Sequence, residues 1–389
     1  MFDAENPLTQ AAQEQMQSLY AAGWEAYKDR QLLRAAEIFG KALEIAELIN
    51  DIRNIALYRF WLGSSLLQAG KLRQAFAVLT PTLKEGTTGG DADDIYNTLA
   101  TYIEIAQDLP VNLGAIEKAY QQTESFLRDS GNLGWRHRLL LLQATLYKLR
   151  GMYPEALATA QESWAIWQDK YPVYIADAHL NSLVEISLLL RDGQQAQMYL
   201  WEWEMNEHDT IPKTRERLSS SRQLNLARLE GRFTEAVDWA RRAILVDNSD
   251  IDTLILMVRT FLCMGDNHRA RDEFIRLLAH RHAETGHYRY DIRLLWGDYH
   301  LACAREAAGM PAVDDVFGLK FPPPSAIANP TATHYTLARA RRGYRAALKV
   351  GSWIDEKLQC TLRQNEISER LARVEAIEHQ FYSLPGSAW

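Results

Sequence analysis

Residues 151–157 read Gly-Met-Tyr-Pro-Glu-Ala-Leu, and this stretch decides the fold. The residues before it, 139–149, have the composition of an apolar helix, and residues 158–164 continue a second helix. Pro154 and Glu155 suit the first turn of that second helix, because a proline loses no hydrogen bond there and an acidic group complements the helix dipole. The stretch therefore predicts a helical hairpin whose apolar face must be covered by further copies of the same unit.

Copies of this unit recur along the chain with a nearly constant period. An alanine in the slot of Ala156 recurs about every 40 residues, with a shorter last step, giving Ala35, Ala75, Ala115, Ala156, Ala196, Ala236 and Ala270. Five residues before this alanine lies Gly70, Gly151, Gly231 or Gly265 in four units and Pro110 in another. We expect the alanines where helices approach closely and the glycines in left-handed turns. A period of this length is typical of stacked helical arrays.

Four positions after most of these alanines lies an aromatic or small residue, and seven positions after them often a small one; this pattern resembles the tetratricopeptide repeat. The best matches are Ala35-Phe39-Ala42 and Ala236-Ala240-Ala243, and looser ones are Ala156-Ala160-Ser163 and Ala270-Phe274-Leu277. The resemblance covers roughly Gln13 to Glu284. The period is longer than the one usual in this family, and in this it is similar to the longer-helix variant of bacterial signal-sensing regulators and kinesin light chains. The resemblance implies an all-α, right-handed solenoid of about seven helical hairpins whose first helices line a concave groove.

The pattern divides the chain into three segments. Residues 1–12 are expected to form a lead broken at Asn6-Pro7, residues 13–285 the repeats, and residues 286–389 a degenerate repeat, a proline-rich strap and capping helices. The strap falls within residues 310–332, where prolines follow Met310, Phe321 and Asn329. It is either ordered and packed by Phe317, Leu319 and Phe321, or a mobile loop.

The C-terminal segment is expected to end in two helices. Gly351 is predicted to end the first, after about residues 333–350, and Ser352 to Asp355 have the form of a capping box for the second. Because the end of a solenoid needs a cap with a polar outer face, these helices are first interpreted as that cap. The alternative is a docking surface for another copy of the chain or for a partner.

Polar and aromatic side chains on the first helix of each repeat are the candidate ligand-binding residues. Asparagine is informative there, because its amide both donates to and accepts from a peptide backbone. The alternative is that these residues are solvated or join neighbouring repeats. The predicted set is Tyr20, Trp24, Tyr27, Asn97, Glu104, Arg138, Lys148, Asn181, Glu185, Asn225, Arg228 and Arg259.

Three members of this set, Tyr20, Trp24 and Tyr27, share one face of the first helix. A first repeat has no upstream neighbour, so exposed aromatic residues there are candidates for a partner site. The alternative is that residues 1–12 pack over them.

Motifs for catalysis or cofactor binding are weak. His280, His282, His287, His300 and Cys303 could supply zinc ligands, but they lack paired, tightly spaced ligands, so no metal is predicted. Asp91-Ala92-Asp93-Asp94 resembles the acidic signature of protonating terpene cyclases, yet helix capping explains it. The chain has no glycine-rich phosphate loop and no Gly-x-Ser-x-Gly motif, so no cofactor is expected.

Composition narrows the class of function further. A net charge of -7 argues against a general nucleic-acid binder, although residues 339–349 form a basic run that suits an acidic partner, RNA or solvent. Three distant cysteines favour reduced thiols and a cytoplasmic location, and no apolar stretch is long enough to cross a membrane.

These observations favour a non-enzymatic module, an adaptor or regulator, that binds a protein or peptide along its concave groove. The alternatives are a scaffold that self-associates through the C-terminal helices and an enzyme built on a helical-repeat frame.

Overall fold

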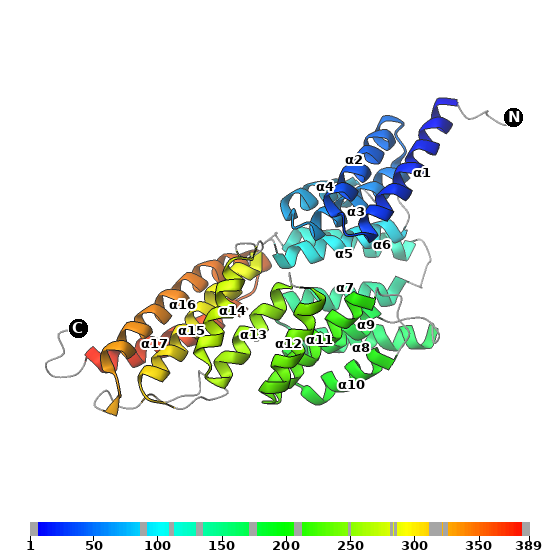
Figure 1. Ribbon diagram of the computed structural model, residues 1–389. Helices are drawn as coiled ribbons and strands as arrows, with labels where there is room; N and C mark the ends of the chain where they lie inside the picture. The colour runs from blue at the N-terminus through cyan, green and yellow to red at the C-terminus, as the bar shows by residue number, and fades with distance from the viewer. Residues whose placement is uncertain are drawn as a thin grey trace. The chain divides into compact units, whose positions relative to one another are not determined.

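The computed structural model describes residues 7–85, 92–108, 113–129, 135–170, 177–205, 212–247, 250–280, 283, 286–310, 321 and 326–382. These residues form helices and no strands (Figure 1). The helices are α1 (Pro7–Lys28), α2 (Leu32–Leu48), α3 (Ile52–Gln68), α4 (Leu72–Glu85), α5 (Ala92–Asp108), α6 (Leu113–Asp129), α7 (Arg136–Leu149), α8 (Tyr153–Lys170), α9 (Asp177–Leu189), α10 (Gly193–Met205), α11 (Pro212–Leu229), α12 (Phe233–Val246), α13 (Ile251–Met264), α14 (Asn267–Leu278), α15 (Gly286–Ala307), α16 (Pro330–Leu358) and α17 (Leu362–Tyr382).

The chain divides into two compact units, Met1–Leu142 and Gln143–Trp389. Within each unit, helices adjacent in sequence pack against one another, as α1 does with α2 and α2 with α3 in the first unit, and α13 with α14 and α15 with α16 in the second. The prediction of an all-α array of helical hairpins is therefore confirmed for the described residues.

The repeated alanine slot is buried in six of the seven predicted positions. Ala35, Ala75, Ala156, Ala236 and Ala270 are fully buried, and Ala196 is nearly so. Ala115 is the exception and is exposed. In α6 the apolar face is carried by Leu113, Ile116 and Ala119, so the buried slot lies one residue later than predicted. Ile116 keeps the period, because it lies almost midway between Ala75 and Ala156 in the sequence.

The turn between the paired helices also repeats in its backbone conformation. The residue five positions before the alanine has positive φ, as expected for glycine in a Schellman-type helix end. Arginine adopts the same conformation in two repeats, so the turn is set by the hairpin and not by glycine alone. The φ values are 60° at Arg30, 74° at Gly70, 76° at Gly151, 58° at Arg191, 74° at Gly231 and 74° at Gly265.

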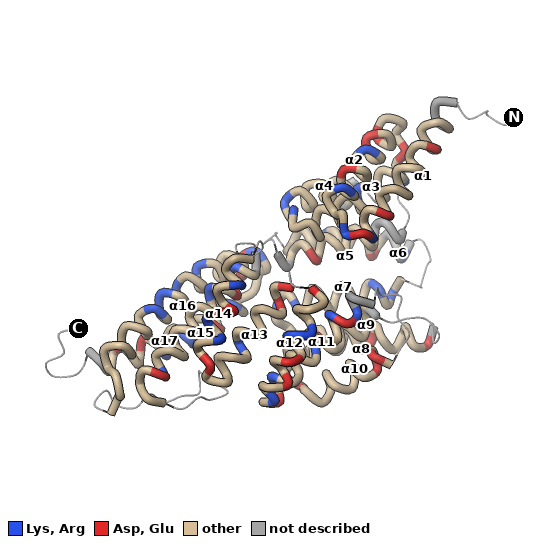
Figure 2. Tube along the Cα trace, in the orientation of Figure 1, with Lys and Arg blue, Asp and Glu red and all other residues tan. Residues whose placement is uncertain are grey.

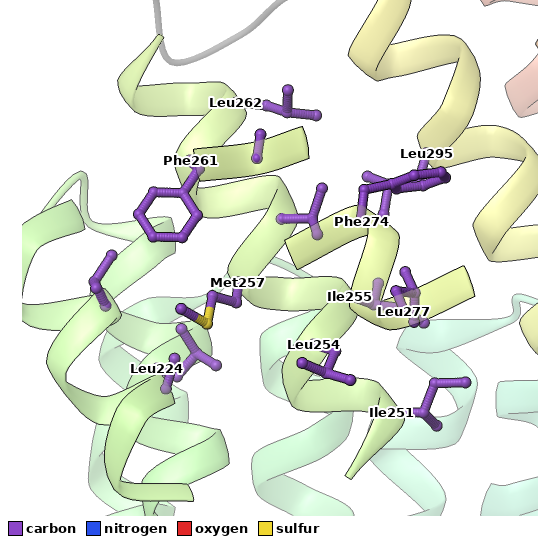
Figure 3. Close-up of a cluster of buried hydrophobic side chains, with 14 of the residues drawn as sticks. Leu224, Ile251, Leu254, Ile255, Met257, Phe261, Leu262, Phe274, Leu277 and Leu295 are labelled. Atoms are coloured by element: carbon purple, nitrogen blue, oxygen red, sulfur yellow. The ribbon is translucent and has the colours of Figure 1, made fainter. Parts of the chain in front are cut away.

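The core of the second unit is continuous between repeats. Met257 and Phe261 project from one side of α13, and Leu262 projects from another toward Phe274 of α14 (Figure 3). Leu295 of α15 belongs to the same buried cluster. Helix α13 thus packs on both sides, as a one-dimensional array requires.

Two predicted helix boundaries are wrong. Helix α1 begins at Pro7, so half of the expected lead is helical. Helix α16 continues through Gly351 and ends at Gln359, which has φ 52°. Gly351 is buried, and an added β-carbon would lie 3.0 Å from the Tyr290 ring and 3.1 Å from Arg363. The glycine therefore serves close packing of helices and not a turn, and Ser352 to Asp355 lie inside the helix.

Part of the predicted strap lies outside the described residues, including Phe317 and Leu319. The described part packs on the C-terminal core, where Ile327 is buried and Phe321 lies against the same cluster. The backbone N–H of Asn329 donates to the carbonyl of Ala307 at 3.0 Å. These residues join the end of α15 to the start of α16.

Candidate functional site

In the second unit, polar side chains link consecutive first helices. Lys148 of α7 donates to Glu185 of α9 at 3.0 Å. Against the effect of burial, the charges of Lys148 and of Arg222 on α11 lower the pKa of the same carboxyl group. In the next repeats, burial and the charge of Arg259 on α13 lower the pKa of Arg228 on α11. Arg259 in turn donates to Asp291 of α15 at 3.1 Å. We call this series the polar ladder, and its members come from α7, α9, α11, α13 and α15.

Glu185 is held by two basic residues of the ladder and remains open to solvent. Desolvation by the surrounding helices would raise the pKa of its carboxyl, but the charge and hydrogen bond of Lys148, with the charge of Arg222, hold that pKa below its usual value. Its side chain is nevertheless 55% exposed, while that of Lys148 is 14% exposed. The carboxylate of Glu185 is thus paired within the ladder and still accessible to solvent.

Two groups of the ladder region have unused hydrogen-bonding atoms. The Oδ1 atom of Asn181 on α9 is buried and has no hydrogen-bond partner among the described residues, and the same holds for the Nε atom of Arg228. Arg228 donates from Nη2 to the Oδ1 atom of Asn225 at 2.8 Å and has no carboxylate partner among the described residues. Burial, followed by the charges of Arg259 and Arg191, lowers the pKa of Arg228 to about 10. An anionic ligand would offset both the burial of the Arg228 charge and its repulsion by Arg259 and Arg191.

The start of α17 borders this region. An added β-carbon at Gly151 would lie 2.9 Å from the methyl groups of Leu362, so the α16–α17 turn packs on the α7–α8 turn. Burial raises the pKa of Tyr153 in the latter turn, where the charges of Arg363, Glu366 and Glu185 also act. The second unit therefore curves enough to bring its last helix next to its first hairpin.

In the first unit, the predicted aromatic residues form a ring cluster with Trp61 of α3. The ring centroids of Trp24 and Tyr27 lie 4.8 and 5.5 Å from that of Trp61, and those of Tyr20 and Phe39 lie 6.2 Å apart. All three predicted residues remain half-buried. Residues 7–12 continue the same helix and so do not cover them, and residues 1–6 lie outside the described part.

The other predicted residues of the first unit are more dispersed. Arg138 lies over the Trp135 ring, 4.6 Å from its centroid, and over the Tyr96 ring at 5.3 Å. Glu104 is exposed and close enough to Tyr27 that its charge, after burial, raises the pKa of that phenol. Asn97 is half-buried, and its carbonyl accepts from the Thr101 hydroxyl at 2.9 Å.

The histidine and cysteine candidates do not converge in the described part of the chain. No group of three His, Cys, Asp or Glu residues suitable for a metal ion is present there. His300 is buried between Trp296 and Tyr299, and the side chains of His282 and His287 lie outside the described residues. The Asp91–Asp94 motif likewise falls outside the described side chains. No described helix has the length and apolar character to cross a membrane.

One pocket in the structure was not predicted from the sequence. It has a volume of about 460 Å³, lies between α12, α13 and α14, and has Met257 and Phe261 in its lining. Its arginines are already paired, Arg276 with Glu273 at 2.6 Å and Arg269 with Asp266 at 3.3 Å. Patterns on single helices could not reveal it, because three helices contribute to it.

The described chain is an all-α protein of stacked helical hairpins. No protein-family model matches it, and no curated protein matches it. Among solved structures, it is similar to the apo form of the quorum sensor NprR from B. thuringiensis, with 11% identity, 94% of this chain and 99% of that chain covered, and a TM-score of 0.45.

Two further structures illustrate the range of these matches. A tetratricopeptide repeat protein from Parabacteroides merdae is 16% identical, with 90% of this chain and 99% of that chain covered and a TM-score of 0.34. The TPR2AB-domain:pHSP90-complex of yeast Sti1 is 18% identical, with 74% and 98% covered and a TM-score of 0.27. Tetratricopeptide repeat proteins are thus among the structures that this chain resembles, as the repeat analysis predicted.

Proposed function

We propose that the protein is a non-enzymatic recognition module that binds an extended peptide or protein segment along the polar ladder of its second unit. The observation that carries the proposal is the pair of unsatisfied groups on neighbouring helices, Oδ1 of Asn181 and the guanidinium of Arg228. A peptide N–H would satisfy the first, and a carboxylate would satisfy the second. The adaptor or regulator role predicted from the sequence belongs to this proposal.

The ladder also provides fixed points for register. Two ion pairs, Lys148 with Glu185 and Arg259 with Asp291, fix the positions of these side chains before a ligand binds. Pre-organised groups lose little entropy on binding. We therefore expect a ligand that carries an acidic side chain or a free C-terminal carboxylate opposite Arg228.

A peptide array tests the proposal. The full chain is applied to random peptides of graded charge, displayed with free and with amidated C-termini. We expect enrichment of peptides with a carboxylate, and at least tenfold weaker binding of the selected peptides to Asn181→Ala and Arg228→Gln. Lys118→Gln serves as the matched control, because Lys118 is exposed on α6 and is not a member of the ladder. Equal binding by all four proteins would contradict the proposal.

A further inference from the structure

The exposed face of α16 carries an unusual positive charge. This helix has six Lys and Arg residues against two Asp and Glu, in a chain whose net charge is -7 (Figure 2). Steps of four and three residues place one set of side chains along a single face, opposite the buried Leu337, Ala340 and Tyr344. We call this set the α16 stripe, and it consists of Tyr335, Arg339, Arg342, Ala346, Lys349 and Trp353.

Two of the three cations of the α16 stripe have no ion pair in the described part of the chain. Arg342 and Lys349 are exposed and have no ion pair among the described residues, whereas Arg345, beside the stripe, pairs with Glu375 at 2.8 Å. Arg339 lies over the Tyr335 ring, 4.6 Å from its centroid. The aromatic residues at the two ends are about half exposed. The stripe is thus cationic in its middle and apolar at its ends.

Helix α2 carries the opposite charge, and from Leu33 to Glu47 its residues follow the same steps of four and three. Its stripe consists of Leu33, Glu37, Gly40, Glu44, Glu47 and Leu48, and it lies opposite the buried Ala35, Phe39, Ala42 and Ala46. The two leucines at its ends are 59% and 85% exposed. Glu44 has no ion pair among the described residues. Glu37 and Glu47 pair with Lys41 and Arg59, but such surface pairs are weak and exchange readily.

Gly40, in the centre of the α2 stripe, is not required by the monomer. An added β-carbon there would meet nothing within 4 Å, and the residue lies well inside a helix. Glycine destabilises a helix relative to alanine, so an open position inside a helix gives no reason for it. Close approach of a second helix would give one.

We propose that the α2 stripe of one copy of the chain binds the α16 stripe of a second copy, with the two helices antiparallel. Every residue advances a helix by the same rise along its axis, so equal residue spacings bring the stripes into register. Lys349 then faces Glu37, Arg342 faces Glu44, and Arg339 faces Glu47. At the same time Trp353 meets Leu33 and Ala346 meets Gly40, while Tyr335 lies just beyond the C-terminal end of α2.

A second copy fits the α16 stripe better than a nucleic acid does. Phosphates would also suit its cations, but the net charge of -7 opposes the approach of a polyanion. The α2 stripe supplies an acidic complement in matching register, with the apolar Leu33 opposite Trp353. One pair of helices makes a small interface, so we expect weak, salt-sensitive association. The contact uses second helices and does not depend on the polar ladder.

Sedimentation velocity of the full chain from micromolar to several hundred micromolar, at low and high salt, tests the contact. We expect association that increases with concentration and weakens at high salt. Glu44→Arg and Arg342→Glu should each weaken it about tenfold or more, because each places like charges opposite one another. An equal mixture of these two variants, or both changes in one chain, should restore it. Strict monomers throughout, or no restoration, would overturn the proposal.

Two further variants test whether the two stripes themselves make the contact. Gly40→Leu should leave the thermal midpoint unchanged or higher, since its side chain meets open space, yet weaken association by blocking the helices. Lys118→Glu, which makes the same change of charge outside both stripes, should associate like the wild type. Fluorescence anisotropy with single-stranded RNA gives the competing outcome. RNA binding that is lost in Arg342→Glu, without self-association of the wild type, would make the stripe a polyanion surface.

Discussion

Leu362, the first residue of α17, packs against Gly151 in the turn between α7 and α8, although the two are far apart in the sequence. The contact ties the C-terminal hairpin to the first hairpin of the second unit. Gly151 therefore has two reasons to be glycine. Its φ of 76° is strained for other residues, and the space beyond its α-carbon is filled by Leu362.

We expect Gly151→Ala to destabilise the second unit more than Gly231→Ala does. Both positions have positive φ, which costs about 1 kcal/mol for alanine. Only at Gly151 does the new methyl group also meet Leu362, because nothing lies within 4 Å at Gly231. The extra loss should be about 1 kcal/mol, measured by urea unfolding. In the Leu362→Ala background the difference between the two glycine substitutions should disappear, and a difference that persists would contradict the contact.

Arg191→Gly should stabilise the protein. Arg191 occupies the turn slot with φ 58°, a conformation that costs a non-glycine residue about 1–2 kcal/mol, part of which glycine loses again through the freedom of the unfolded chain. The net gain should be about 0.5–1 kcal/mol. Arg191→Ala keeps the strained conformation and serves as the control in the same unfolding assay. A gain from alanine equal to that from glycine would assign the effect to loss of the charge near Arg228.

The sequence predicted the hairpins well because each alanine slot depends on neighbouring residues only. The same local pattern failed at Ala115, where two nearby residues, Ala115 and Ile116, both fit the period. Gly351 was misassigned because its role depends on Tyr290 and Arg363, which are distant in sequence. Four members of the polar ladder were predicted from the sequence, Lys148, Glu185, Arg228 and Arg259, whereas Arg222 and Asp291 were not, and the ion pairs of the ladder join different helices. Neither those pairs nor the unused atoms of Asn181 and Arg228 could be inferred from spacing.

His300 should make the protein less stable in mild acid. The residue is 4% exposed, and neither of its buried ring nitrogens has a hydrogen-bond partner in the part of the chain that the structure describes. Burial, with the charge of Arg339, lowers its pKa from 6.5 to about 4. Between pH 6.5 and about 4, His300 is therefore protonated in the unfolded chain and neutral in the folded protein. Stability falls as the pH drops through this window, and the loss approaches roughly 3 kcal/mol near pH 4.

His300→Phe removes that titration and should keep the ring contact with Trp296. At pH 7.5 we expect stability equal to or about 1 kcal/mol above that of the wild type, because an unsatisfied buried polar group is removed. The advantage should grow as the pH falls from 6.5 to 4, as measured by urea midpoints at each pH. His268→Phe is the control, since His268 is exposed on α14. Parallel pH curves for His300→Phe and the wild type would show that His300 titrates normally.

Asp298 of α15 joins the last three helices, and its loss should be costly. Its Oδ1 atom accepts from the Tyr344 hydroxyl of α16 at 2.8 Å, and Arg370 of α17 donates to both of its oxygens at 2.6 and 2.8 Å. Burial alone would lower the pKa of Arg370, but Asp298 and Glu366 raise it above its usual value. Asp298→Ala removes the more buried of the two carboxylates that compensate this cation and leaves only the half-exposed Glu366, so we expect a loss of about 3 kcal/mol.

The double variant Asp298→Ala/Arg370→Met distinguishes an uncompensated charge from a simple cavity. Removing the cation as well removes the penalty of burying it alone, so the double variant should be more stable than Asp298→Ala, even though it has lost more contacts. Guanidinium unfolding followed by circular dichroism measures both losses, with Glu369→Ala as an exposed control on α17. The single variant Arg370→Met is measured in the same way. If the loss of the double variant equals the sum of the losses of Asp298→Ala and Arg370→Met, Asp298 acts through packing, and the ion pair contributes nothing specific to joining α15 and α17.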